Sequence, residues 1–382
     1  MNILVISRGM PTPKDPQWGC FEYDQAKALS KLGHNVILAS VDSRFRLRWR
    51  NWGLTMKEIE TVHYYNFFLC PGAISGLFGY GFKNTLKTWQ WNLIVKKIIQ
   101  DEGPIDVIYA HYLFNSYFAV NALKQLKAPI VAIEHWSELN KDPLSNNILK
   151  MANDTYPYVQ RAITVSTPLR NRLKQLFNID PKVVYNMVGD EFLYTPTSLS
   201  NKVRYVTTGS LVFRKGFDMF AKALSILNLP KDKWELNIIG EGEEHQNLQN
   251  QIEQCGFTEN IHLVGSKSKD EIAKMLNESN VFVLPSRNEN FSVAVLEALA
   301  CGLPVIASIC GGIRECIDEK NGLLFEVDDV EGLSKAINHM FYHYQDYDRQ
   351  AIADDCKARF SSEVIAKQLT QIFEDVINKR SQ

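Results

Sequence analysis

The sequence predicts an α/β protein made of two doubly wound parallel sheets. Short apolar runs alternate with amphipathic segments along the chain, and this alternation occurs in two successive series. The length of 382 residues also exceeds what one hydrophobic core usually supports, which favours two domains of about 150 to 200 residues. In such sheets ligands bind at the carboxyl ends of the strands, so we look for functional residues there.

The first series occupies the N-terminal half of the chain. Its predicted strands are the short apolar runs at 3–6, 36–39, 106–110, 130–134, 162–165 and 183–185. An amphipathic helix over 22–32 follows the first strand and ends at Gly33, because glycine is favoured directly after a helix. Strands separated by helical segments predict a parallel sheet.

The second series begins near residue 203. Its predicted strands are 204–208, 235–239, 261–264, 281–284 and 305–307, and its predicted helices are 217–227, 244–254, 269–277 and 293–300. A polar Pro/Ser/Thr stretch at 194–200 predicts the linker between the domains. The expected domains are therefore 1–195 and 196–361, and the final helix, 362–382, is expected to join the first.

Composition excludes several classes of protein. Hydrophobic residues at 45% and charged residues at 22% indicate a globular protein, and a net charge of -1 gives no global argument for nucleic-acid binding. No apolar run approaches the ~20 residues that span a bilayer, and the first strand is too short for a signal peptide. The seven cysteines form no CxxC pair, so we expect reduced thiols, no zinc site and a cytoplasmic location.

The loop 209–216 predicts a phosphate site. It follows a strand and precedes a helix, and it carries Arg214 and Lys215. Unpaired N–H groups at a helix start, together with two cationic side chains, suit a phosphate group. A solvated basic turn is the alternative interpretation.

Two glutamates frame the helix that is predicted at 293–300. Glu289 precedes the helix, Ser292 is a favourable N-cap, and Glu297 lies on the second helical turn. A diphosphate at this helix start would leave each carboxylate free to accept hydrogen bonds from sugar or ribose hydroxyls. The alternative is a solvated loop end and an exposed helix face. A dinucleotide site would need GxGxxG after the first strand, where the sequence reads Ser7-Arg8-Gly9-Met10-Pro11.

Residues 43–92 interrupt the first series. Arginines alternate with aromatic and aliphatic residues over 44–50, and a glycine-aromatic stretch follows at 71–82. A solvated strand face is the default interpretation of such a charge run. The alternative is a contact with the inner face of an anionic membrane, which the neighbouring Trp49 and Trp52 favour.

These motifs resemble the retaining glycosyltransferases of family four, which have the two-domain GT-B fold. The resemblance covers nearly the whole chain and is strongest over 203–325. It rests on motifs in the family's order and approximate spacing: Glu289-x7-Glu297, "ALACGLPVIAS", Gly311-Gly312, "NGLLF", Lys215-Gly216, Gly240-Glu241-Gly242 and Val264-Gly265. It implies two Rossmann-like domains facing across a cleft, with acceptor bound by 1–195 and nucleotide sugar by 196–361.

The resemblance also implies roles for single residues. The implied catalytic residues are Lys215 on the donor diphosphate, Glu289 beside the donor sugar, and His135 close to the reaction centre. The implied donor-binding residues are Gly19, Arg214, Lys215, Gly240, Gly265, Ser266, Glu289, Asn290, Phe291, Ser292, Val293 and Glu297. The implied acceptor-side residues are His111, Glu134 and Trp136. Where the family often has arginine this chain has Ser210, and Arg214 is expected to supply that charge.

The expected activity is transfer of a hexose from a nucleotide diphosphate sugar, with UDP-sugar favoured, to a saccharide or lipid-linked saccharide. Retention of configuration, a setting in cell-envelope or capsular polysaccharide synthesis, and no cofactor or metal are implied with it. No DxD-like acidic pair stands where it could hold Mg²⁺. The alternatives are a nucleotide-sugar epimerase on the same scaffold and a non-catalytic nucleotide-sugar-binding subunit.

Overall fold

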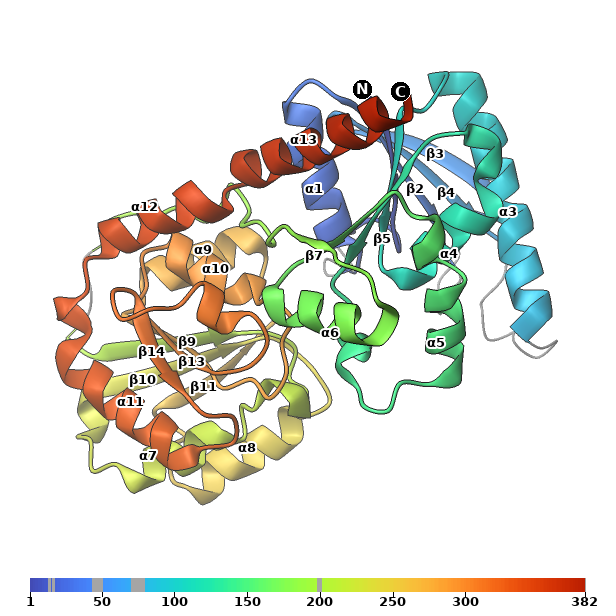
Figure 1. The fold of residues 1–382 in the computed structure, drawn as a ribbon. Helices are drawn as coiled ribbons and strands as arrows, with labels where there is room; N and C mark the ends of the chain where they lie inside the picture. The colour runs from blue at the N-terminus through green and yellow to red at the C-terminus, as the bar shows by residue number, and fades with distance from the viewer. Residues whose placement is uncertain (13–14, 16–17, 43–50, 70–79, 198–200, 382) are drawn as a thin grey trace. The chain divides into compact units, whose positions relative to one another are not determined.

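The chain folds into two compact units, each described here by itself. The computed structural model describes residues 1–381 except 13–14, 16–17, 43–50, 70–79 and 198–200 (Figure 1). One unit comprises 1–184 and 365–382, and the other comprises 185–364. The expected seam was the linker at 194–200, whereas the chain leaves the first unit after Val184. The segment that follows belongs to the second unit because the Tyr185 ring stacks on Phe291, with ring centroids 4.9 Å apart.

The N-terminal unit contains an eight-stranded sheet. Its spatial order is β3-β4-β2-β1-β5-β6-β7-β8. The strands are β1 (Asn2–Ile6), β2 (Asn35–Val41), β3 (Gly53–Ile59), β4 (Val62–Phe68), β5 (Val107–His111), β6 (Ile130–Glu134), β7 (Arg161–Thr164) and β8 (Lys182–Val183). All neighbours are parallel except β3, which pairs antiparallel with β4 at the sheet edge. The expectation of a parallel sheet therefore holds for every strand of this unit except β3.

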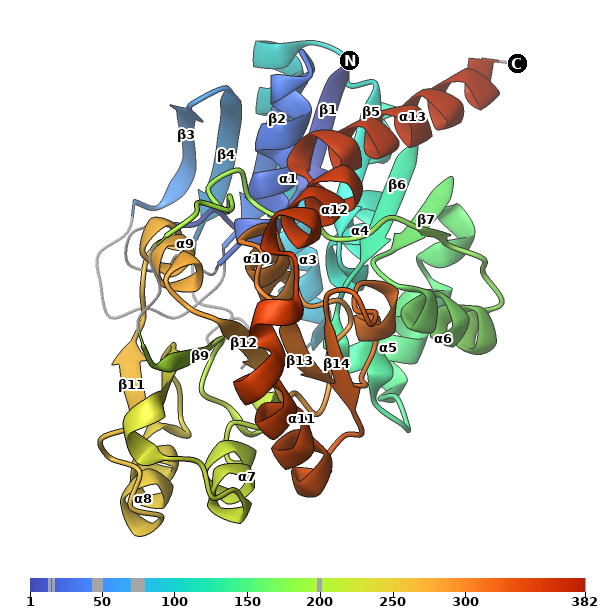
Figure 2. The same cartoon turned by 90° about the vertical axis from the view of Figure 1, so that its left-hand side faces the viewer.

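Helices cover both faces of this sheet (Figures 1 and 2). They are α1 (Cys20–Lys31), α3 (Tyr80–Glu102), α4 (Leu113–Ala122), α5 (Asn146–Asn153), α6 (Thr167–Phe177) and α13 (Ser362–Ser381). On one face, Trp91 of α3 and Phe118 of α4 pack with Ile108 of β5 in one buried cluster. On the other face, Tyr109 of β5 meets Phe373 of α13 edge-on, with ring centroids 5.1 Å apart. Successive strand residues thus point to opposite helical layers, which explains why the strands are apolar without alternation.

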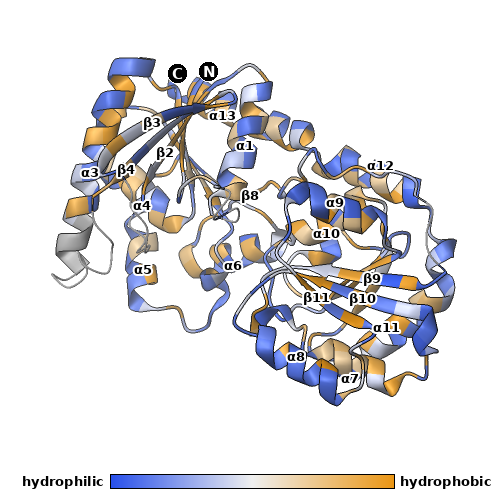
Figure 3. Ribbon diagram, turned by 180° about the vertical axis from the view of Figure 1, so that it is seen from behind, coloured by the Kyte–Doolittle hydropathy of each residue, from blue (hydrophilic) through white to orange (hydrophobic). Residues whose placement is uncertain are grey.

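The C-terminal unit contains a six-stranded, fully parallel sheet. Its order is β11-β10-β9-β12-β13-β14. The strands are β9 (Val203–Thr208), β10 (Trp234–Ile239), β11 (Ile261–Gly265), β12 (Val281–Leu284), β13 (Val305–Ser308) and β14 (Gly322–Phe325). The helices are α7 (Met219–Ile226), α8 (His245–Gln254), α9 (Lys269–Asn277), α10 (Val293–Ala300), α11 (Val330–His343) and α12 (Arg349–Phe360). Figure 3 shows α8 as mainly hydrophilic, in keeping with its two buried residues, Leu248 and Ile252.

Strand order places a switch point in each sheet. In the C-terminal unit β9 lies between β10 and β12, and in the N-terminal unit β1 lies between β2 and β5. The loops after β9 and β12, and those after β1 and β5, therefore diverge and leave room for a ligand between them. The predicted site residues follow these strands and their neighbours.

Candidate active site

All the predicted donor-binding residues except Gly19, which lies in the N-terminal unit, gather at the carboxyl ends of the strands of the C-terminal sheet. Two backbone hydrogen bonds of 3.0 Å connect successive strand ends: Gly209 N–H donates to the Ile239 carbonyl, and Gly240 N–H to the Gly265 carbonyl. Gly265 ends β11, and Ser266 follows it. The loop that contains Lys215 follows β9, next to the loop after β12, so the structure brings the sequence-separated motifs to neighbouring strand ends.

Lys215 and Glu289 form a buried ion pair. The Lys215 ammonium nitrogen Nζ lies 2.6 Å from Glu289 Oε1, and both side chains are about nine-tenths buried. Ser286 Oγ donates a second hydrogen bond of 2.9 Å to the same carboxylate oxygen. Glu289 is therefore neither a solvated loop end nor an exposed tip. It lies inside the loop that precedes α10, and it is held there by Lys215 of the loop after β9.

The electrostatics of Glu289 follow from these contacts. Burial alone would raise the pKa of its carboxyl group, because a charged group loses its hydration. The neighbouring Lys215 and Arg214 cations and the Ser286 hydrogen bond outweigh burial and hold the pKa below its ordinary value. Glu289 is thus a carboxylate at neutral pH, and Lys215 is the cation that mainly compensates its charge.

Arg214 and Arg287 fix the two loops against each other. Arg214 Nη1 donates to the Asn288 carbonyl at 2.9 Å and lies 3.6 Å from Glu289 Oε2. This position agrees with the expectation that Arg214 supplies a charge beside Lys215. Arg287 forms ion pairs of 2.7 Å with both Asp218 and Asp328, and its guanidinium lies 3.9 Å from the Phe213 ring centroid. Arg287 and Ser286 were not among the predicted site residues, although both border the predicted motif.

The start of α10 lacks a side-chain cap. Ser292 is the N-cap residue, as predicted, but its side chain makes no capping hydrogen bond. Phe291 is 4% exposed, and its ring packs on Tyr185, so only its backbone can serve a ligand. Asn290 is buried and accepts a backbone bond from Gly312, whereas Glu297 lies half-buried on α10. The first N–H groups of α10, from Val293 onward, thus lack a Ser292 side-chain cap.

Two glycines allow the loops to pass this closely. Gly216 has φ 70°, and a Cβ there would lie 1.9 Å from the Pro285 carbonyl oxygen. Gly311 has φ 53°, and a Cβ there would lie 1.9 Å from the Glu289 carbonyl oxygen. Any side chain at either position would displace the backbone around Glu289, which explains the Lys215-Gly216 and Gly311-Gly312 motifs physically.

In the N-terminal unit, the predicted glycine loop is held by an ion pair. Gly19 caps α1 with φ 75°, and a Cβ there would lie 2.2 Å from the Gly9 carbonyl oxygen. Glu22 is fully buried, and Arg8 donates two hydrogen bonds to its carboxylate, from Nε to Oε1 at 2.8 Å and from Nη2 to Oε2 at 3.1 Å. Burial opposes ionisation of Glu22, but Arg8 outweighs it and lowers the pKa to about 2. Arg8 was not predicted as a site residue, because its position was considered only for a glycine fingerprint.

Two histidines meet at the ends of β5 and β6. His111 Nδ1 lies 3.4 Å from His135 Nε2, and the His135 ring stacks on Tyr112 with centroids 4.0 Å apart. Tyr112 has φ 69° and ψ 150°, a costly conformation for a residue with a side chain. Burial is the main reason that the pKa of His111 is lowered to about 4 and that of His135 well below its ordinary value. Both rings are therefore neutral at physiological pH.

Glu134 and Trp136 flank His135 but differ in character. Glu134 is fully buried, and neither carboxylate oxygen has a hydrogen-bond partner of acceptable geometry among the described residues. Burial raises its pKa to about 8, against smaller lowering contributions from the nearby Leu113 amide and Tyr156 hydroxyl. Glu134 is thus largely protonated at neutral pH. Trp136 is half-buried and meets Phe114 edge-on, with ring centroids 5.6 Å apart.

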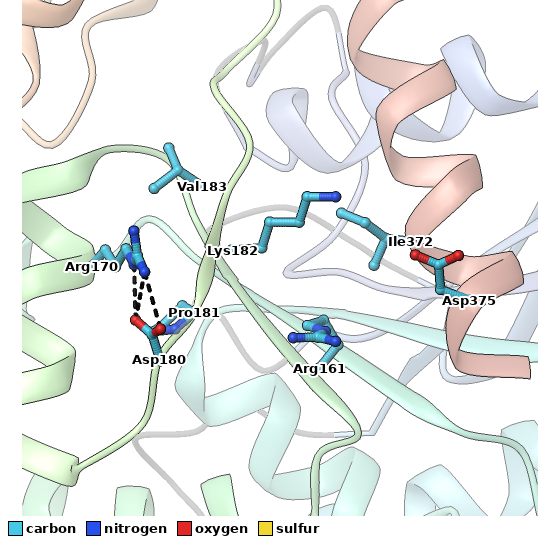
Figure 4. Close-up of a pocket in the computed structure, with 8 residues that line it drawn as sticks. All are labelled: Arg161, Arg170, Asp180, Pro181, Lys182, Val183, Ile372 and Asp375. Atoms are coloured by element: carbon cyan, nitrogen blue, oxygen red, sulfur yellow. Dashed lines mark hydrogen bonds and ion pairs between the residues drawn. The ribbon is translucent and has the colours of Figure 1, made fainter. Parts of the chain in front are cut away.

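A separate cavity of about 320 Å³ lies elsewhere in the N-terminal unit (Figure 4). Arg161 and Lys182, the first residues of β7 and β8, line it with Asp375 of α13. Arg170 is held there by Asp180, with Nε at 2.9 Å from Oδ1. The cavity lies at the amino ends of its strands, whereas His111 and His135 follow carboxyl ends, and none of the predicted site residues lines it. The cavity is thus separate from the predicted site residues.

The structure also bears on metal binding. In the part of the chain that it describes, no group of three or more His, Cys, Asp or Glu side chains is placed to hold a metal ion. The cationic side chains of Arg214 and Lys215 and the carboxylate of Glu289 lie beside the start of α10.

Comparison with known proteins defines the class. Residues 196–353 match the family model of glycosyl transferases group 1, and residues 23–192 match that of glycosyltransferase family 4. An uncharacterized glycosyltransferase of Methanocaldococcus jannaschii is 30% identical over 249 residues, which are 64% of this chain and 67% of that protein. The chain therefore belongs to the group 1, family 4 glycosyltransferases, and the resemblance inferred from its motifs is confirmed.

Further similar proteins extend over most of the chain. N-acetyl-alpha-D-glucosaminyl L-malate synthase of Bacillus anthracis is 23% identical over 370 residues, 92% of both chains. The amylovoran biosynthesis glycosyltransferase AmsK of Erwinia amylovora is 25% identical and covers 70% of both. Among solved structures, sucrose-phosphate synthase from Thermosynechococcus elongatus has a TM-score of 0.81 at 17% identity, over 99% of this chain and 100% of that one. This likeness confirms the predicted GT-B fold.

We predict that Lys215→Met lowers the melting temperature at pH 7 by roughly 5 to 10 °C, because it leaves the Glu289 carboxylate buried without its closest partner. The pKa of Glu289 is lowered in the folded protein, so this stabilisation is present above the ordinary carboxyl pKa of 4.5 and is lost below it. Without Lys215 the effect of burial on the pKa of Glu289 is less opposed, so the variant takes up this proton at higher pH than wild type does, and its difference from wild type should shrink as the pH falls from 7 towards 4. Thermal denaturation followed by circular dichroism measures both effects.

Lys222→Met is the matched control for this experiment. Lys222 lies 3.5 Å from Asp218, and its side chain is 55% exposed. Its removal should change the melting temperature little at any pH, as for other exposed ion pairs. An equal loss in the two variants would show that the Lys215–Glu289 pair has no special role in stability.

A second prediction concerns Glu134→Gln. Because the pKa of Glu134 is raised to about 8 on folding, wild type loses stability as the pH rises from about 4.5 to 8, and the neutral amide should not. The variant should match wild type near pH 5 and exceed it near pH 8.5 by an amount on the order of 2 to 4 kcal/mol. Urea denaturation at both pH values measures this. Glu138→Gln, at a more exposed carboxyl group of the same unit, is the control. A difference between Glu134→Gln and wild type that does not change with pH would refute the raised pKa of Glu134.

Proposed function

We propose that this protein transfers a hexose from a nucleotide diphosphate sugar to a saccharide or lipid-linked saccharide, with retention of anomeric configuration. One observation carries the proposal: the Lys215–Glu289 pair, with Arg214 beside it, lies at the ends of adjacent strands next to the start of α10. This arrangement offers cations and backbone donors to a diphosphate, and a carboxylate to a sugar hydroxyl.

The leaving group sets the chemical demand on this site. As the bond between the anomeric carbon and the phosphate oxygen breaks, the departing diphosphate gains negative charge and the sugar gains oxocarbenium character. Lys215, Arg214 and the N–H groups of α10 supply positive charge where the first develops. We expect the reaction to need no metal ion, since these groups already provide that charge. Glu289 would orient the sugar and stabilise its positive character.

The acceptor completes the transfer. Its hydroxyl oxygen forms the new bond to the anomeric carbon from the face that the diphosphate leaves, and its proton passes to a phosphate oxygen of the leaving group. Every bond is then accounted for without a covalent enzyme intermediate. In this proposal His135 lies near the reacting carbon, and Trp136 offers a half-buried aromatic surface on which a sugar ring can stack.

The donor base and the biological setting rest on similar proteins. The Anabaena protein HepE has been solved in complex with UDP and with UDP-glucose; the latter structure has a TM-score of 0.71 at 18% identity, over 98% of this chain and all of that one. Among sequence relatives, AmsK is an amylovoran biosynthesis glycosyltransferase. These similarities favour a UDP-sugar as donor and the assembly of an envelope or capsular polysaccharide as the setting.

A thermal-shift panel of UDP-, GDP-, ADP- and TDP-glucose with EDTA tests donor binding. We predict that UDP-glucose raises the melting temperature, by an amount equivalent to about 2.7 kcal/mol at a hundred times its dissociation constant. Glu297→Ala should abolish this shift, because it removes a carboxylate proposed to accept the ribose hydroxyls. Glu253→Ala, an exposed carboxylate on α8, should leave it unchanged. A melting-temperature shift with UDP-glucose that appears only with added metal would refute the prediction that donor binding needs no metal ion.

We also propose that the segment 43–92 contacts an anionic membrane surface. Residues 43–50 and 70–79 lie outside the described residues. Within the described part, Trp52 is 63% exposed and Trp89 is 48% exposed, and tryptophan suits the interface between water and lipid. Among the described helices, none combines the length and apolar character needed to cross a bilayer.

Co-sedimentation with vesicles of phosphatidylglycerol tests this contact, with phosphatidylcholine vesicles as comparison. We predict binding to the anionic vesicles that weakens with salt, and a loss of roughly tenfold in affinity for the double variant Trp52→Ser, Trp89→Ser. Tyr342→Ser, a change at a side chain that is 64% exposed in the other unit, is the control. Equal binding by the double variant and wild type would exclude these tryptophans from the contact.

A further inference from the structure

His111 lies in a position from which it can determine the protonation of His135. It is the last residue of β5, and His135 directly follows β6, the parallel neighbour of β5. The Tyr112 N–H donates to the Ile133 carbonyl at 2.9 Å and keeps the two strand ends together. The imidazoles therefore meet through His111 Nδ1 and His135 Nε2, 3.4 Å apart.

A hydrogen bond between two imidazoles requires one N–H and one lone pair. Two imidazolium rings would place N–H against N–H, so at most one ring can be charged while this contact exists. Burial keeps both pKa values below the ordinary range, and both rings are neutral. Each ring then carries a single proton, and the two possible arrangements are Nδ1–H of His111 donating to His135, or Nε2–H of His135 donating to His111.

The surroundings of His111 distinguish these arrangements. His111 is fully buried, and its Nε2 has no hydrogen-bond partner among the described residues. If His135 were the donor, the single proton of His111 would sit on this Nε2, as a buried N–H without an acceptor. If His111 donates from Nδ1, its Nε2 keeps only a lone pair. Orphaned buried donors are rarer in proteins than under-used acceptors, so the second arrangement is favoured.

We infer that His111 is a positioning residue, which donates from Nδ1 to His135 Nε2 and thereby fixes His135 as the tautomer with its proton on Nδ1. The Tyr112 ring, stacked at 4.0 Å and 17° on His135, limits rotation of the same imidazole.

This arrangement has a chemical consequence for sugar transfer, which rests on the proposed function. With Nε2 occupied by His111, the single proton of His135 lies on Nδ1, so any hydrogen bond that this ring makes with a substrate oxygen is one that the ring donates. It cannot accept the proton of the acceptor hydroxyl at Nε2. His135 is thus a hydrogen-bond donor and not the general base, in keeping with proton transfer to the departing diphosphate.

Nitrogen-15 NMR of the histidine side chains tests the tautomer directly, without substrate. The whole protein is labelled with ¹⁵N-histidine, and His135→Gln identifies the signals of His135. We expect wild-type His135 to be neutral with its proton on Nδ1 at pH 7. His111→Asn, whose amide nitrogen takes the place of Nδ1, should keep this tautomer, and His111→Leu, which removes the donor, should lose it. A proton on His135 Nε2 in wild type would overturn the inference.

Kinetics of the same variants test the role in catalysis. His111→Leu should lower kcat by roughly 10- to 100-fold with the donor KM within about threefold, and His111→Asn should stay within about threefold of wild type. Near-ultraviolet circular dichroism confirms that each variant is folded. Equal damage in both variants, with the tautomer kept in His111→Asn, would refute positioning through the tautomer. If wild type transfers no sugar from any donor, the proposed function fails, while the NMR result still decides the tautomer.

Discussion

The buried contact between Lys215 and Glu289 is the interaction on which the C-terminal site depends. A carboxylate that is nine-tenths buried is costly unless a cation and hydrogen bonds compensate it. Lys215 at 2.6 Å and Ser286 at 2.9 Å do so, and Lys215 thereby joins the loop after β9 to the loop after β12 across the switch point of the sheet. Gly216 and Gly311 allow the backbone to pass close to Pro285 and Glu289 beside this junction.

The two units use charge in different ways. In the C-terminal unit Lys215 and Arg214 both face the single carboxylate of Glu289, so the site carries an excess of positive charge that suits a diphosphate. In the N-terminal unit Arg8 and Glu22 neutralise each other, and both histidines are neutral. Neutral imidazoles beside aromatic rings suit a sugar hydroxyl better than a phosphate.

Much of this architecture was predictable from the sequence. The strands 130–134 and 281–284 were predicted with their observed ends, because residues buried on both faces give uninterrupted apolar runs. The hairpin of β3 and β4 was missed, since exposed residues such as Lys57 and Glu58 interrupt the apolar pattern at a sheet edge. Likewise the sequence places Glu134 beside His135, but its burial near Tyr156 depends on packing between distant segments.

A crystal structure of this protein with UDP, grown in EDTA, would show whether the Lys215–Glu289 junction binds the donor diphosphate. We predict a diphosphate within hydrogen-bond distance of the Lys215 ammonium and of the first N–H groups of α10, with Lys215 moved from Glu289 towards a phosphate oxygen. Glu289 would then be free to meet a sugar hydroxyl. A UDP molecule bound elsewhere, with the Lys215–Glu289 contact unchanged, would show that this junction is not the diphosphate site.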